Sequence, residues 1–330
     1  MNQNKTGKYF KYAIGEIILV VIGILIALSI NNWNEQRKSL EKSKILLTQL
    51  HKELAMNIYK ANIVIRFYRN KDSIIYKALH KKLTYNDYKT RNNRYIPLLR
   101  GSLQVNIIND AFINLIENQN EFNQTQDIIL EKLKHLYGTD KREVDAMDEY
   151  VMNSLFNRIK LLEKDGWIYD NHISKTASDE QINYYLTSSN YLGEVTEYKI
   201  RHLNDHNNLT LKFRNHAIDI YNEISDYLTL EKDTSIVKDI NEYQHYLGAY
   251  EREEGDFIYE IKKQNNNLIW AWKHKTNSKR SGEINFYPDS KTYFTVSDNR
   301  FGKIIYSNNN EVTGFILSLG EKRHEYKKIK

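Results

Sequence analysis

The chain has 330 residues and no cysteine, which excludes disulfide bonds, thiol nucleophiles and thiolate metal sites. Its formal net charge is +6, but Lys and Arg are interleaved with Asp and Glu almost throughout, so no nucleic-acid partner is expected. Only two prolines occur, which favours a mainly helical chain, and the length allows two domains.

The first predicted element is a transmembrane helix over residues 13–33, after a tail of residues 1–12. From Ile17 to Ile30 the sequence carries no charge, and together with Ala13 to Glu16 this run approaches the ~20 residues that a spanning helix needs. Trp33 at the far end suits the headgroup zone. The lipid bilayer is therefore an expected partner.

Three further residues of this segment are candidates for membrane contacts. Glu16 lies near one interface, where its carboxylate reaches water or a neighbouring helix. Gly23 and Ala27 form a small-xxx-small pattern that lets a second helix approach closely. The pattern predicts a homo-oligomer, formed through the membrane helix and the coiled coil that follows.

The basic residues before the apolar run indicate its orientation. Lys5, Lys8 and Lys11 precede it without any acidic residue, which favours a cytoplasmic N-terminus. The predicted location is therefore the bacterial inner membrane, single-pass, with the bulk periplasmic. A cleaved signal peptide, with a cleavage site near Ala27 to Ser29, is the alternative.

Residues 34–235 are predicted to form a periplasmic helical domain. Apolar residues recur at helical spacing in one long helix to about His80, at Leu40, Leu47, Leu50, Leu54, Ala61 and Val64. A loop is expected over 84–97, followed by helices over 103–116, from 128 to a cap at Gly138, from 139 to Gly166, and over 179–230. A helical bundle or coiled coil accommodates them.

Residues 240–330 have a different pattern. Short runs such as FIYEIKK, NLIWAW and KIIYS alternate apolar with polar residues and are separated by Asn, Gly, Asp and Ser, which predicts six or seven antiparallel strands. The expected fold is therefore α+β: an N-terminal transmembrane helix, an extended helical bundle or coiled coil, and a small C-terminal β-barrel or sandwich.

Two histidines are weak candidates for metal ligands. His202 and His206 lie one helical turn apart, so both imidazoles can face one ion. No third ligand follows from the spacing, and exposed histidines on a polar helix face explain it as well. Neither a metal nor a cofactor is expected.

Two Ser-x-x-Lys sequences match the order in which a lysine deprotonates a serine nucleophile, at Ser39 to Lys42 and at Ser235 to Lys238. Neither lies in a domain that can build an oxyanion hole, so no catalytic residue is assigned.

Four aromatic residues of the β module are candidates for an apolar ligand site: Trp270, Trp272, Tyr287 and Phe294. They can line a barrel cavity or simply form the core.

Two segments resemble known families. KYAIGEIILVVIGILIALSINNWNE and, more loosely, the sequence to about residue 230 resemble an uncharacterised family of single-pass membrane proteins of flavobacterial type. Residues 243–328, with YLGAYE, NLIWAW and NFYPDSKTYFTV, are similar to the lipocalin-like β domain appended to penicillin-binding-protein-like serine hydrolases. The resemblances imply anchoring in the inner membrane and an accessory β domain, and neither carries over functional residues.

The leading hypothesis is a membrane-anchored periplasmic binding or scaffold protein without catalytic activity, whose β module binds a protein partner or a small envelope ligand. The alternative is an envelope hydrolase, or an accessory subunit of a membrane-associated hydrolase. A sensor that signals through the short tail is a third possibility.

Overall fold

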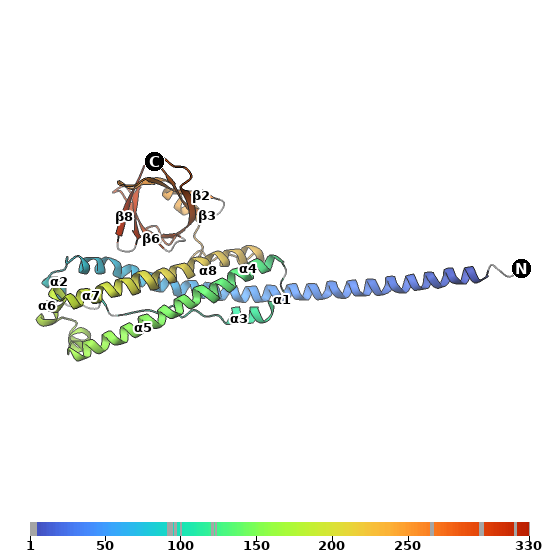
Figure 1. Cartoon of the computed structure of the whole chain (residues 1–330), viewed down its shortest axis with the longest axis horizontal. Helices are drawn as coiled ribbons and strands as arrows, with labels where there is room; N and C mark the ends of the chain where they lie inside the picture. Colours follow the sequence, from blue (N-terminus) through green and yellow to red (C-terminus); the bar gives the residue numbers. More distant parts are fainter. Residues whose placement is uncertain are drawn as a thin grey trace.

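The computed structural model describes residues 5–90, 95, 98–99, 101–119, 122, 124–264, 267–296, 300–319 and 322–329. A single helical rod leads into a body of packed helices, and a small barrel lies against the side of that body (Figure 1). The expected α+β class, with a long apolar N-terminal helix, further helices and a small antiparallel barrel, is confirmed.

The rod is α1 (Lys5–Leu79), one uninterrupted helix of 75 residues. Its N-terminal part stands alone in Figure 1, and its large apolar side chains from Ile14 to Ile30 are exposed. The described part of the chain contains one helix long and apolar enough to cross a membrane, and it is α1. The predicted membrane residues all lie on this exposed part: Glu16, Gly23, Ala27 and Trp33.

The C-terminal part of α1 enters the helical body. The predicted stripe Leu47, Leu50, Leu54, Ala61 and Val64 is buried as expected. Leu40 is the exception, since it is 38% exposed and precedes the point where α1 meets the other helices. α8 (Asn207–Leu228) lies alongside this half of α1 (Figure 1), and its buried apolar side chains belong to the same core as the stripe.

The other helices complete the body. They are α2 (Tyr85–Lys89), α3 (Asp110–Glu117), α4 (Gln124–His135), the π-helical η2 (Leu136–Asp140), α5 (Lys141–Lys164), the π-helical η3 (Asp170–Ser174), α6 (Asp179–Thr187), α7 (Ser189–Tyr198) and the π-helical η4 (Lys199–His206).

The helix predicted over 103–116 is shorter, because residues 101–109 are not helical. The backbone amides of Val105 and Asn106 donate to the buried carboxylate of Asp148, and the amide of Ile108 donates to Asn57. These side chains from α5 and α1 replace the hydrogen bonds that a helix would make. In the loop predicted over 84–97, α2 occupies the start, while residues 91–94 and Pro97 lie outside the described residues.

Two helix boundaries were predicted wrongly. Gly138 does not cap a helix; it lies inside η2, which joins α4 to α5 without a break. The long helix expected over 179–230 is divided at Ser188, whose hydroxyl accepts a hydrogen bond from the Tyr191 amide and caps α7.

The β module is a closed antiparallel barrel of eight strands, one or two more than predicted. After the 3₁₀ helix η5 (Ile240–Tyr246) the strands are β1 (Gly248–Glu251), β2 (Phe257–Gln264), β3 (Asn267–His274), β4 (Ser281–Pro288), β5 (Tyr293–Val296), β6 (Arg300–Tyr306), β7 (Val312–Leu319) and β8 (Lys322–Lys328). Tyr250 of β1 pairs with Lys328 of β8, which closes the sheet. Closure removes the exposed edges of an open sheet.

Candidate functional site

A cleft with a volume of about 780 Å³ lies between the helical body and the barrel. α1 and α8 form one wall, β3, β4 and the turn after β4 form the other, and residues 233–240 form the end. Its apolar lining includes Ala55, Met56, Ile65, Ile218, Ile236, Val237, Leu268 and Phe286, and its charged lining is Lys52, Arg66, Arg69, Arg214, Asp219, Asp233, Lys238 and Asp289.

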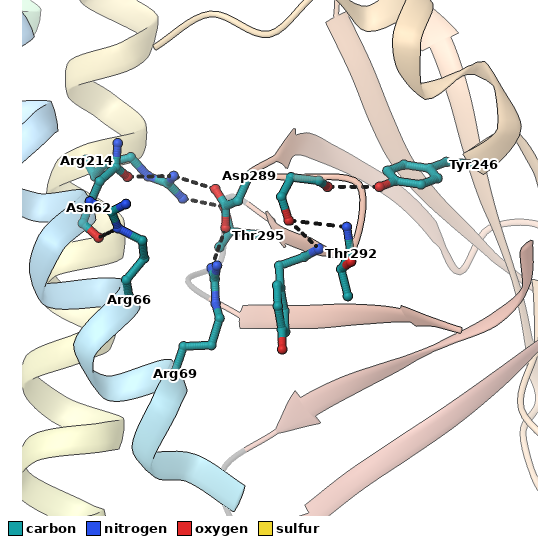
Figure 2. Close-up of polar contacts among 10 residues, drawn as sticks. Asn62, Arg66, Arg69, Arg214, Tyr246, Asp289, Thr292 and Thr295 are labelled. Carbon is teal, nitrogen blue, oxygen red and sulfur yellow. Dashed lines mark hydrogen bonds and ion pairs between the residues drawn. The ribbon is translucent and has the colours of Figure 1, made fainter. Parts of the chain in front are cut away.

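An arginine–aspartate cluster made by Arg69, Arg214 and Asp289 lies between the helical body and the barrel (Figure 2). Arg69 of α1 donates to Asp289 Oδ2 at 2.6 Å, and Arg214 of α8 donates to Oδ1 at 2.6 Å. The second terminal nitrogen of Arg214 donates to Thr295 Oγ1 of β5 at 2.6 Å. The exposed fractions of the three charged side chains are 13%, 4% and 11%, so water screens this cluster little.

The turn after β4 fixes the position of Asp289. Pro288 ends the strand, and the amides of Asp289 and Ser290 both donate to the Tyr293 carbonyl. Ser290 Oγ accepts hydrogen bonds from the amides of Thr292 and Tyr293, and the Tyr246 hydroxyl donates to the Ser290 carbonyl at 2.9 Å (Figure 2). The carboxylate is thus held toward the two helices before any ligand arrives.

The cleft carries an excess of positive charge. Five basic and three acidic side chains line it, and two guanidinium groups share the single carboxylate of Asp289. Arg66, one turn before Arg69, donates its Nε to the Asn62 carbonyl and makes no ion pair with any described residue. Arg66 is therefore a cation of the cleft that can receive an anion without giving up an ion pair with a described residue.

The carboxylate of Asp219 contributes less to offsetting this positive charge. The Tyr287 hydroxyl donates to it at 3.0 and 2.9 Å, and burial raises the pKa of Asp219 above its usual value. Burial and the nearby carboxylate also raise the pKa of Tyr287. The Asp219–Tyr287 contact thus joins α8 to β4.

The four predicted aromatic residues do not share one site. Trp270 and Phe294 lie in the barrel interior, 1% and 0% exposed, packed with Phe286 and Phe315. Trp272 covers Gly282, where a side chain would meet its ring. Tyr287 points out of the barrel into the cleft. The barrel interior around Trp270 is therefore a packed core. Tyr287, in contrast, is placed where it can contact a ligand in the cleft.

The predicted histidine pair is buried in the helical body, contrary to the expectation of an exposed helix face. His206 is hydrogen bonded on both ring nitrogens, to the Tyr68 hydroxyl at 2.7 Å and to Asp148 at 2.8 Å. His202 stacks on Tyr198 at 4.0 Å, and burial lowers its pKa to about 3. Within the described residues no third ligand joins the pair.

Sequence analysis did not identify Arg69, Arg214 or Asp289. The only local signal was Arg214, a basic residue between the apolar Phe213 and Ala217 of a predicted helix. Asp289 follows a strand like any turn residue, and its two partners come from helices far away in the sequence.

Residues 16–99 match the model of a family of unknown function, DUF6090. The match covers α1 from Glu16 onward, α2 and the sequence as far as residue 99, and it agrees with the predicted uncharacterised domain. Comparison with curated proteins and with solved structures finds no match. The flavobacterial type and the lipocalin-like character of the barrel stay predictions.

Proposed function

We propose that the protein is a membrane-anchored binding protein without catalytic activity of its own, and that the cleft between helical body and barrel binds an amphiphilic anion. The observation that carries this proposal is the charge of the cleft: two arginines share one aspartate, and Arg66 beside them has no acidic partner among the described residues.

The chemistry of the lining defines the ligand class. A guanidinium group presents planar donors that match a carboxylate or a phosphate, and such bonds are roughly twice as strong as neutral ones. Ile65, Ile218 and Leu268 belong to the apolar part of the same lining. A ligand with one anionic head and a short apolar body satisfies both parts.

The position of the cleft on α1 separates it from the apolar segment. Lys52 and Arg69 lie roughly 30 and 55 Å beyond Trp33 along the helix, at a rise of about 1.5 Å per residue. With the basic N-terminal tail in the cytoplasm, the cleft faces the periplasm of a bacterial inner-membrane protein. Its ligand is then a soluble envelope molecule or an amphiphile that has left the bilayer.

The alternative, an envelope hydrolase, is favoured by one observation: Ser235 and Lys238 of a Ser-x-x-Lys sequence both line the cleft. Lys238 Nζ donates to the Thr234 carbonyl at 3.0 Å. Under the binding proposal, the parent chain turns over no ligand of the cleft.

The test is calorimetric titration of the full chain in nanodiscs with n-hexyl phosphate, using 1-hexanol and inorganic phosphate as probes that each lack one half of the ligand. We expect binding of n-hexyl phosphate alone, and a loss of about tenfold in Arg66→Gln, since a hydrogen bond to a charged group contributes about 1.5–3 kcal/mol.

The matched control is Arg37→Gln, an exposed arginine of the same helix outside the cleft. Its affinity should equal that of the parent chain. Equal binding of 1-hexanol, or an Arg66→Gln variant that binds as tightly as the parent, would refute the proposal.

A further inference from the structure

The π-helical segment η2 brings together two residues that an α-helix would separate. In an α-helix, side chains three or four positions apart are neighbours. In η2 the Lys141 amide donates to the Leu136 carbonyl, five residues before it, so one turn contains an extra residue. His135 and Asp140 are thereby brought together, and His135 Nε2 lies 3.6 Å from Asp140 Oδ1. Such π-helical turns are frequent at functional sites.

A third side chain completes the group from α8. His216 Nδ1 lies 2.6 Å from Asp140 Oδ2, and the two imidazole rings are 6.0 Å apart. One ligand atom from each residue lies within 4.8 Å of the other two. Ligand atoms around a tetrahedral zinc ion lie about 3.3 Å apart, given bonds of about 2.0–2.2 Å, so small side-chain rotations are enough to close the site.

The carboxylate at the centre is buried and incompletely satisfied. The side chain of Asp140 is 0% exposed, and its Oδ1 accepts no hydrogen bond from any described residue. The Lys212 ammonium forms an ion pair with Oδ1 at 3.0 Å, and Lys212 also donates to Glu143 at 2.8 Å. Lys212 can therefore release Asp140 and keep an ionic partner.

We propose that His135, Asp140 and His216 form a binding site for Zn²⁺, through His135 Nε2, Asp140 Oδ1 and His216 Nδ1. Two imidazoles and one carboxylate are borderline and hard donors of the kind that zinc accepts. His135 is exposed and both histidines line a groove of about 1050 Å³ between α4, α8 and the segment that enters the barrel. The fourth position of the ion faces this groove, where a water molecule can occupy it.

This inference is independent of the amphiphile site, although the groove adjoins the cleft and shares seven lining residues with it, Asp219 and Lys238 among them. It concerns different residues and a different ligand.

The test uses the full chain in detergent, without an affinity tag, after treatment with a chelator and dialysis. Isothermal titration with ZnCl₂ should show one site per chain, and Co²⁺ should give the intense visible absorption of a tetrahedral ion. His135→Gln should reduce zinc affinity at least about tenfold, as loss of a ligand exceeds the 10- to 100-fold effects of groups behind the ligands.

His135 is exposed, so this variant keeps its fold, which circular dichroism verifies. His80→Gln is the matched control, an exposed histidine at the end of α1, and should bind zinc as the parent does. Lys212→Met distinguishes a metal site from a plain ionic network: removal of the competing ammonium should tighten zinc binding.

Absence of a single site, or zinc affinity unchanged in His135→Gln, would overturn the inference. Weaker zinc binding in Lys212→Met would do the same, because it would assign Lys212 a supporting role.

Discussion

The helical body and the barrel each have a core, and the two cores differ in composition. Of the sixteen polar or charged residues that are buried in the described chain, all but Thr295 belong to the helical part. The barrel core consists of aromatic and aliphatic side chains, with Trp270, Phe294 and Phe315 in edge and stacked contacts. Even Thr295 is hydrogen bonded to Arg214 of the helical body.

The difference shows how each part depends on its surroundings. An apolar core is stabilised by burial and dispersion, which do not change with pH. A buried polar network is stabilised only while every donor and acceptor stays paired, and its histidines and carboxylates couple it to pH. The stability of the barrel core is thus expected to depend little on pH, whereas that of the helical body depends on its buried histidines and carboxylates.

The largest effect is expected from Phe294→Ala in the barrel. Truncation of a buried phenylalanine costs about 3–5 kcal/mol, and we expect the barrel to lose this amount at pH 5 and at pH 8 alike. Hydrogen exchange of the β5 and β6 amides, followed by mass spectrometry, measures it separately from the helical body. Phe156→Ala, at a position that is 53% exposed, should change little.

A companion variant tests the contact itself. Gly302 pairs with Phe294 across β5 and β6, and a Cβ there would meet the phenyl ring. Gly302→Ala should destabilise the parent chain but not Phe294→Ala, since the alanine then enters vacated space. Equal destabilisation in both backgrounds would contradict the packing described here.

The next effect is expected from Asp148→Ala in the helical body. The variant leaves the amides of Val105 and Asn106 and one nitrogen of His206 without their acceptor, at a cost of about 3 kcal/mol. Urea denaturation followed by far-ultraviolet circular dichroism measures the change. Asp145→Ala, an exposed carboxylate on the same helix, is the control and should stay within about 0.5 kcal/mol.

The smallest effect is expected from His202→Phe, and it depends on pH. The folded-state pKa of His202 is about 3, below the ~6.5 of an unfolded histidine. The unfolded chain therefore binds more protons below pH 6.5, and stability falls as the pH falls from 6.5 toward 3. Burial is the main cause, with the charges of His206, Lys71 and Arg158 adding to it.

Phenylalanine keeps the stacking on Tyr198 and does not titrate. We compare the free energies of unfolding of the variant and the parent. The difference, variant minus parent, should be about 2 kcal/mol larger at pH 5 than at pH 8. Urea denaturation at the two pH values measures this, with His80→Phe as the exposed control. A parent chain that loses no stability between pH 8 and pH 5 would refute the assignment.

The sequence predicted the regular parts of the fold. The stripe from Leu47 to Val64 identified the buried face of α1, and the alternation in residues 257–319 identified six strands that the structure contains. In both cases the signal is local periodicity, which side-chain burial imposes directly on the sequence.

The sequence did not predict the polar contacts. Asp148 holds the segment around Val105 out of a helix, and Asp289 joins two helices to the barrel, each across a long stretch of chain. The proximity of His135 and Asp140 depends on a π-helical turn, which no local pattern indicates. Such contacts arise from tertiary packing, so the candidate site became visible only in the structure.

The continuity of α1 has a geometric consequence for the whole molecule. Between Trp33 and Ser43 the helix runs mostly exposed, from the apolar segment into the body. Each residue inserted there would turn the body by about 100° around the helix axis and advance it by about 1.5 Å, with both ends unchanged. The number of residues in this stretch thus sets the rotational orientation of the cleft around the axis of α1.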